Sequence, residues 1–140
     1  MAKFTDNRIG VSYMEQKYKW GNRSRKVLAT LHPDWQRILN EAIKWYDISL
    51  LEGYRGKNEQ NEAYELGRSK LKFPQSKHNR KPSLAVDLAP YPIDWKDLNR
   101  FRSLVFFIQG IAAGMGINVI CGIDWNGDLK ANESFVDAPH

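Results

Sequence analysis

The chain has 140 residues, a length that suits one domain with a buried core. Hydrophobic residues make up 42% of it and aromatic residues 12%, a composition that excludes a disordered chain. The net charge of +5 permits a polyanionic partner, such as nucleic acid, an anionic membrane surface or an acidic cell-wall polymer, without choosing among them. The single cysteine, Cys121, excludes an internal disulfide, and we interpret it as a small buried hydrophobic residue.

Residues 1–26 are polar, basic and aromatic, without a clear period. We predict that they form an arm packed on a single domain, and that this domain comprises the whole chain, residues 1–140. Lysines and arginines are interleaved here with tyrosines and a tryptophan, which could indicate nucleic-acid binding, although a solvated basic face is the commoner meaning. The first six residues contain no apolar segment, so we expect no signal peptide.

The first predicted helix begins at Pro33, because a proline at the first helical position lacks only an N–H that the helix leaves unpaired anyway. Apolar residues then recur at helical spacing and form one predicted buried face: Trp35, Ile38, Leu39, Ala42, Ile43 and Tyr46. A short strand is predicted over residues 48–54. A polar helix with a thin buried stripe is predicted over residues 57–70.

In the second half of the chain, a strand is predicted over residues 84–88, ended by Pro90 and Pro92. A long apolar helix is predicted over residues 94–114, and its longest apolar run is far too short to span a bilayer. Residues 117–121 are the most β-branched run and are predicted to form a central strand. Because helices and strands mix without regular alternation, we predict an α+β fold with a small antiparallel sheet flanked by helices.

The histidines are the first candidates for metal ligands. His32 lies at the predicted start of a helix, where a capping role is sufficient, and we exclude it as a ligand. His78 follows a polar loop and precedes the predicted strand that carries Asp87. Since this strand should be buried, the carboxylate needs a cation in order to stay ionised, and either a metal ion or Arg80 or Lys81 could supply it.

His78, Asp87 and His140 can be interpreted as one zinc site at the predicted sheet. Two imidazoles and one carboxylate leave one position of a tetrahedral zinc ion open for water. The pKa of such a water falls to roughly 7, so it can act as a nucleophile at neutral pH, and hydrolysis is the leading hypothesis. The spacing alone is weak support, and a binding module whose histidines and aspartate are structural stays open as an alternative.

A second possible ion site lies near the end of the chain. Asp124, Asn126 and Asp128 imitate the start of a calcium-binding loop. However, Leu129 occupies the position that requires glycine, and Phe135 occupies that of the closing glutamate. The sequence therefore favours an ordinary turn, and calcium regulation here stays open.

Several motifs, in order along the chain, resemble the M15 family of zinc peptidases. Residues 76–78, Ser-Lys-His, followed by residues 85–87, Ala-Val-Asp, resemble its S-x-H…A-x-D signature, and residues 135–140 resemble its closing acid-x-x-His element. Other segments resemble the phage endolysin branch of this family: residues 28–34, residues 52–55 with Gln60, residues 67–70 and residues 122–125. Together these motifs cover most of the chain and are specific as a set.

The resemblance implies a role for each matching residue. It makes His78, Asp87 and His140 the zinc ligands, Asp137 the catalytic base, and Arg55 the residue that meets the substrate carbonyl. The implied substrate-binding residues are Ser76, Gln60 and Trp125. Relatives continue beyond the last ligand with an aromatic residue, an acid and a leucine, so we expect a terminal histidine to hold zinc less firmly.

The resemblance to the endolysin branch also implies an activity, the zinc-dependent hydrolysis of the bond between L-alanine and D-glutamate in the peptidoglycan stem peptide. The alternatives are a D-Ala-D-Ala carboxypeptidase and a basic nucleic-acid- or cell-wall-binding module without catalysis. We expect a monomer with Zn²⁺ as cofactor and peptidoglycan as partner, without nucleic acid or membrane insertion. We expect it to be made in the host bacterial cytoplasm and to act on the wall after release.

Overall fold

The structure is a computed structural model that describes residues 3–6, 11–122 and 140. Its elements in chain order are β1 (Lys3–Asp6), β2 (Val11–Met14), α1 (Asn22–Leu28), α2 (Pro33–Ala42), β3 (Ile48–Glu52), α3 (Lys57–Glu65), the 3₁₀ helix η1 (Lys77–Asn79), β4 (Asp87–Pro90) and α4 (Leu98–Gly114). β1 pairs with β2 and β3 with β4, both antiparallel. The predicted α+β class with a small antiparallel sheet is therefore confirmed.

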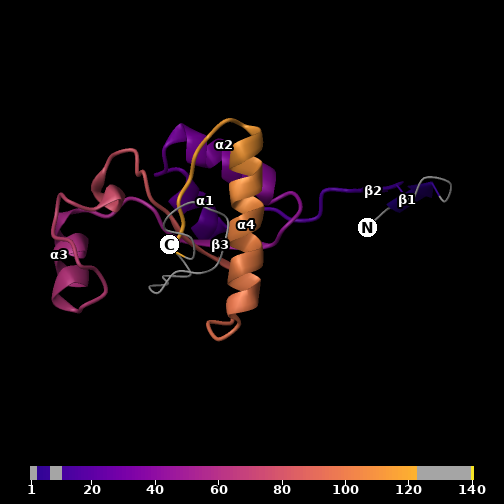
Figure 1. Cartoon of the computed structure of the whole chain (residues 1–140). Helices are drawn as coiled ribbons and strands as arrows, with labels where there is room; N and C mark the ends of the chain where they lie inside the picture. The colour runs from indigo at the N-terminus through magenta and orange to yellow at the C-terminus, as the bar shows by residue number, and fades with distance from the viewer. Residues whose placement is uncertain (1–2, 7–10, 123–139) are drawn as a thin grey trace.

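The main core lies where α2 and α4 pack against each other and against the β3–β4 pair. Figure 1 shows α3 on one side of this body and the β1–β2 pair on the opposite side. Leu39 of α2, Leu50 of β3 and Leu104 of α4 are almost completely buried in this core. In the described part of the chain, no helix combines the length and the apolar composition needed to cross a membrane.

Helix α2 forms as its sequence predicts. Pro33 is its first residue, and Ile38, Leu39 and Ala42 are the buried face. His32 is the N-cap, and its Nδ1 accepts a hydrogen bond from the backbone N–H of Asp34 at 3.1 Å. The capping role expected for His32 is therefore confirmed, and it accounts for this histidine without a metal.

The helix predicted over residues 57–70 is too long, because α3 ends at Glu65. Gly67 has a φ of 75°, a left-handed conformation that glycine adopts without strain. The N–H of Gly67 bonds to the carbonyl of Tyr64 at 3.1 Å, and that of Arg68 to the carbonyl of Ala63 at 2.8 Å. This pair of bonds is a Schellman motif, which satisfies the last carbonyls and stops the helix.

Both strands predicted in the second half need correction. β4 spans Asp87–Pro90 instead of residues 84–88, because Ser83 holds the preceding segment in a turn: its hydroxyl donates to the Ala85 carbonyl at 2.7 Å. The predicted central strand over residues 117–121 is wrong. Residues 117–120 have no regular structure, and Cys121 forms only a single bridge. β-Branched residues favour a strand only where a neighbouring strand offers its hydrogen bonds, and the described residues offer none over 117–120.

The predicted N-terminal arm contains more regular structure than its sequence suggests. It includes the β1–β2 pair and the start of α1, and Tyr18 and Trp20 pack at the edge of the main core. The Ser24 hydroxyl of α1 accepts a hydrogen bond from the N–H of Leu50 at 3.0 Å, which joins α1 to β3. That residues 1–26 form one packed arm of a single domain stays a prediction.

Candidate metal centre

Three of the predicted site residues, far apart in the sequence, meet in space. His78 lies in η1, Asp87 is the first residue of β4, and His140 lies beside them. Their ligand atoms are all within 4.8 Å of one another. Asp87 Oδ1 lies 3.2 Å from His140 Nδ1 and 3.5 Å from His78 Nε2. The imidazole rings of the two histidines pack edge to face, with 5.2 Å between their centroids. Two imidazoles and a carboxylate thus converge on one point.

The tautomer of His78 follows from its hydrogen bond. Its Nδ1 lies 2.7 Å from the carbonyl oxygen of Gly53, and a carbonyl can only accept, so Nδ1 carries the hydrogen. Nε2 then presents a lone pair toward Asp87 and His140. This nitrogen is buried, and none of the described residues forms a hydrogen bond with it. A buried polar atom without a partner is costly, and a metal ion at the cluster would satisfy it. The donor set therefore fits a metal.

Asp87 is the electrostatic centre of the cluster. Burial by itself raises the pKa of this carboxyl, but the adjacent imidazoles of His140 and His78 outweigh burial and hold the pKa well below its ordinary value. The guanidinium of Arg55 also lies close to this carboxylate, 3.8 Å from Asp87 Oδ2. The carboxylate is thus ionised and ready to bind a cation, and the basic neighbour is Arg55 instead of Arg80 or Lys81.

Arg55 is held in place by two neighbours. Its Nε and one terminal nitrogen donate to the two carboxylate oxygens of Glu52, each at 2.8 Å, and its other terminal nitrogen donates to Gln60 Oε1 at 2.9 Å. The hydrogen bonds to Glu52 raise the pKa of the guanidinium, against the opposing effect of burial. Arg55 forms an ion pair with Glu52. Its own side chain is only 11% exposed, so Arg55 is not a surface arginine. A substrate role for Arg55 stays a prediction.

Gln60 is completely buried, and all of its hydrogen-bonding groups are used inside the protein. Its Nε2 donates to the Leu71 carbonyl at 2.6 Å and to the Ser69 hydroxyl at 3.0 Å. Its Oε1 accepts from Arg55 and, at 3.1 Å, from Asn79 Nδ2. In this structure Gln60 therefore positions Arg55, and its predicted contact with substrate stays a prediction.

Ser76 orients His78 through the backbone. Its hydroxyl caps η1 by accepting from the N–H of His78 at 3.2 Å, while Asn79 Oδ1 accepts from the N–H of Ser76 at 3.0 Å. This reciprocal arrangement is a capping box. Asn79 also donates to the Arg55 carbonyl at 2.9 Å, and sequence analysis did not single it out. The sequence contains a signal for this role, because a serine followed three residues later by a residue with a side-chain amide, here Asn79, resembles a capping box.

Five of the predicted residues belong to the last segment of the chain. The proposed base Asp137 and the substrate-binding candidate Trp125 lie outside the described residues. The possible calcium ligands at residues 124–128 also lie there. Ser76 is buried at the start of η1, so its substrate role stays a prediction, as do the substrate role of Trp125 and the role of Asp137 as base.

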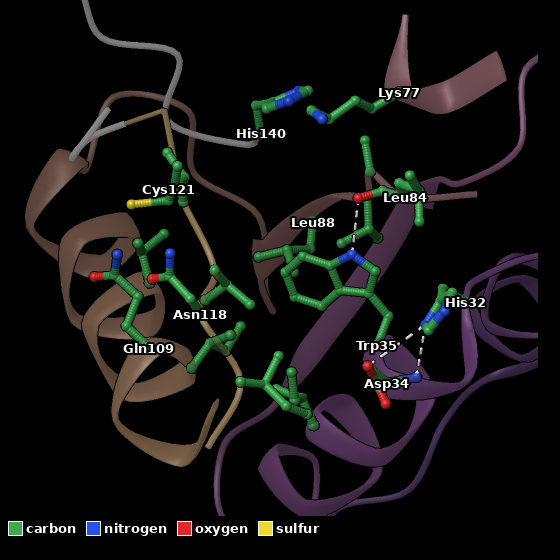
Figure 2. Close-up of a pocket in the computed structure, with 18 residues that line it drawn as sticks. His32, Asp34, Trp35, Lys77, Leu84, Leu88, Gln109, Asn118, Cys121 and His140 are labelled. Atoms are coloured by element: carbon green, nitrogen blue, oxygen red, sulfur yellow. Dashed lines mark hydrogen bonds and ion pairs between the residues drawn. The ribbon is translucent and has the colours of Figure 1, made fainter. Parts of the chain in front are cut away.

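A cavity of about 650 Å³ opens beside the cluster. Apolar side chains from α2, α4 and residues 117–121 form most of its wall. Figure 2 shows Lys77 and His140 together at one end, and His32 with Asp34 at another. Trp35 lies between them, and its indole N–H donates to the Leu84 carbonyl at 3.0 Å. Of the three cluster residues, His140 lines the cavity and so connects it to the candidate metal centre.

Gly53 carries the carbonyl that orients His78, and it cannot be replaced by a larger residue without a shift. A Cβ at this position would lie 2.3 Å from Thr30 Oγ1 and 2.8 Å from Leu31 Cδ2. We expect Gly53→Ala to destabilise the fold by about 1–3 kcal/mol and to weaken metal binding by about 10- to 100-fold. Urea denaturation and metal titration measure the two effects.

Gly110→Ala is the matched control, because a Cβ there meets nothing within 4 Å and the residue is exposed on α4. This variant should bind metal like the wild type and gain up to about 1 kcal/mol of stability. Wild-type stability and metal affinity in Gly53→Ala would show that the Cβ is accommodated without a shift of the backbone at residue 53.

Comparisons with known proteins point to one family. A family model described as phage L-alanyl-D-glutamate peptidase matches residues 16–140. The chain is 33% identical over 114 residues to the L-alanyl-D-glutamate peptidase of Escherichia phage T5, a match that covers 78% of this chain and 82% of that protein. The solved structure of the L-Ala D-Glu endopeptidase ChiX of Serratia marcescens is similar with a TM-score of 0.66 and 25% sequence identity, over 80% of this chain and 84% of ChiX. The chain therefore belongs to the phage L-alanyl-D-glutamate peptidase family.

Proposed function

We propose that the protein is a zinc-dependent endopeptidase that cleaves the bond between L-alanine and D-glutamate in the peptidoglycan stem peptide. The observation that carries the proposal is the convergence of His78, Asp87 and His140, where the buried Nε2 of His78 has no hydrogen-bond partner within the described part of the chain. Family membership supports the substrate, since the matching family and both relatives are named for this bond.

Zinc is the metal that these three residues suit best. Two imidazoles and one carboxylate are a known ligand set of catalytic zinc, whereas calcium and magnesium prefer oxygen ligands alone. When bound, zinc would polarise the scissile carbonyl and make a water molecule acidic enough to attack at neutral pH. The carbonyl of Gly53 supports this assignment, because it fixes the His78 tautomer that can bind a metal through Nε2.

The protein's own groups would move the protons and stabilise the charge. Asp137 accepts a proton from the attacking water and then donates it to the leaving amine. Its assignment rests on the resemblance of residues 135–140 to the closing motif of the family. Arg55 stabilises the negative charge that develops on the carbonyl oxygen.

The hydrogen bonds of Arg55 agree with this role. A guanidinium has five N–H groups, and three are used by Glu52 and Gln60. Two remain, and the terminal nitrogen nearest to Asp87 faces the candidate metal centre at 3.8 Å from its carboxylate. Glu52 and Gln60 therefore position Arg55, and the two free N–H groups are available to a substrate oxygen. Further contacts to substrate are proposed for Ser76 and Trp125.

Digestion of purified peptidoglycan tests the proposal. The expected products carry new amino groups on glutamate, with little free D-alanine. A chelator should stop the reaction, and zinc added in excess of the chelator should restore it, because His78, Asp87 and His140 supply the only metal cluster among the described residues. Free D-alanine as the main product would instead indicate a carboxypeptidase. Binding to the wall without any cleavage would indicate a binding module.

A further inference from the structure

Lys77 is a cation at the mouth of the cavity that the proposed chemistry does not use. It is the residue before His78 in η1, its side chain is exposed, and it lines the cavity together with His140. Figure 2 shows the Lys77 side chain extending from η1 toward the His140 ring. Of the described residues that line this cavity, Lys77 is the only lysine or arginine.

The ammonium of Lys77 has no partner in the described part of the chain, whereas Arg55 and Asp34 nearby each have one. Among the described residues it makes no hydrogen bond or ion pair. By contrast, Arg55 is bonded to Glu52 and Gln60. The carboxylate of Asp34, which also lines the cavity, lies 3.7 Å from a cation of α2, Arg37. Of the described residues that line the cavity, Lys77 is thus the lysine or arginine that can meet an anionic group of the substrate.

The backbone of Lys77 is fixed even though its side chain is free. Its carbonyl accepts hydrogen bonds from the N–H of Leu84 at 3.1 Å and from the N–H of Arg80 at 3.4 Å. The next residue, His78, is buried and held by Gly53. Lys77 and His78 are consecutive residues of one short helix. The Lys77 side chain therefore starts from a fixed backbone position next to the candidate metal centre.

We propose that Lys77 is a specificity residue that binds the α-carboxylate of D-glutamate on the leaving side of the scissile bond. This inference rests on the proposed function. In the stem peptide the nitrogen of glutamate belongs to the scissile amide, and its γ-carboxyl continues the chain, so its α-carboxyl is free. That carboxylate is two bonds from the scissile nitrogen. Wherever the amide meets the centre, the carboxylate lies close beside it, within reach of a neighbouring lysine.

Charge complementarity decides the expected preference. An ammonium–carboxylate hydrogen bond is stronger than one between neutral groups, and it is lost when the carboxylate becomes a carboxamide of the same shape. The wild-type protein should therefore cleave L-Ala–γ-D-Glu-L-Lys with a free α-carboxylate about tenfold faster, in kcat/KM, than the same peptide with an α-carboxamide. Lys77 adds selectivity for acidic over amidated stem peptides.

The test measures kcat/KM on both peptides for the wild type, Lys77→Met and Lys81→Met, together with the zinc content of each. Lys81 is the matched control, an exposed lysine whose ammonium lies over the Tyr54 ring and does not line the cavity. With zinc retained, Lys77→Met should lose its preference, with a ratio near one, and should cleave the carboxamide like the wild type. Lys81→Met should keep the wild-type ratio.

Three results would overturn the inference. An unchanged ratio in Lys77→Met would show that the lysine does not meet the carboxylate. Equal loss on both peptides would show that it acts on the scissile amide or on the metal centre instead. Failure of the wild-type protein to cleave either peptide would refute the proposed function itself, which separates that failure from the other two.

Discussion

Replacing His78 by alanine is expected to abolish hydrolysis and to remove the bound metal. The variant loses a proposed ligand whose tautomer is fixed by the Gly53 carbonyl, and two proposed ligands remain, Asp87 and His140. Catalytic zinc sites ordinarily use three protein ligands, so affinity should fall steeply. Metal content per chain and the rate of peptidoglycan digestion measure the two losses.

Thermal unfolding with and without zinc separates a lost metal site from a misfolded protein. A ligand that binds only the folded state stabilises it by about 2.7 kcal/mol at one hundred times its Kd, so zinc should raise the Tm of the wild type. Zinc should not raise the Tm of His78→Ala. Without zinc the loss of stability in His78→Ala is partly offset, since the substitution also removes the buried Nε2, which no described residue satisfies.

His32→Ala is the control for this experiment. His32 caps α2 and is not part of the metal cluster, so its loss should cost about 0.5–2 kcal/mol of stability and leave zinc binding intact. Equal loss of zinc in the two variants would reject the ligand assignment.

Replacing Asp137 by asparagine is expected to leave zinc bound and to lower kcat by about 10²–10⁴-fold. The asparagine amide keeps the size of the side chain, but it cannot accept a proton at neutral pH. If Asp137 is the general base, the two measurements separate: metal content stays at the wild-type level while the rate falls. Zinc analysis and digestion rates on the same preparation provide both.

Asp94→Asn is a matched control, because Asp94 is exposed and its carboxylate accepts a hydrogen bond from the N–H of Lys96 at 3.0 Å. It should keep both zinc and activity. Loss of zinc in Asp137→Asn would make Asp137 a ligand and would require another base. Wild-type activity in that variant would remove Asp137 from the reaction.

The sequence alone determined the elements whose signals are local. Helix α2 was predictable because Pro33 sets its first turn and its apolar residues repeat at helical spacing. The exclusion of His32 followed from the same logic, since a side chain before a helix start can bond to the backbone two residues later. The three residues of the candidate metal centre were predictable only through the order of several motifs, because the spacing between His78 and Asp87 carries little information.

The tertiary structure decided which partner each group has. Nothing local in the sequence indicates that the carbonyl of Gly53 fixes the tautomer of His78, 25 residues away. Likewise, the choice of Arg55 over Arg80 as the cation beside Asp87 depends on the antiparallel register that places Glu52 opposite Asp87. Residues 117–121 are a case in which a local signal gave a wrong prediction, because the partner that it required is missing among the described residues.

Their β-branched residues predicted a strand, yet no strand forms over residues 117–120, and the reason is physical. A helix satisfies its hydrogen bonds within its own segment, so its sequence can specify it. A strand, a metal centre and an oriented imidazole each depend on groups supplied by distant parts of the chain, and only the folded structure brings those groups together.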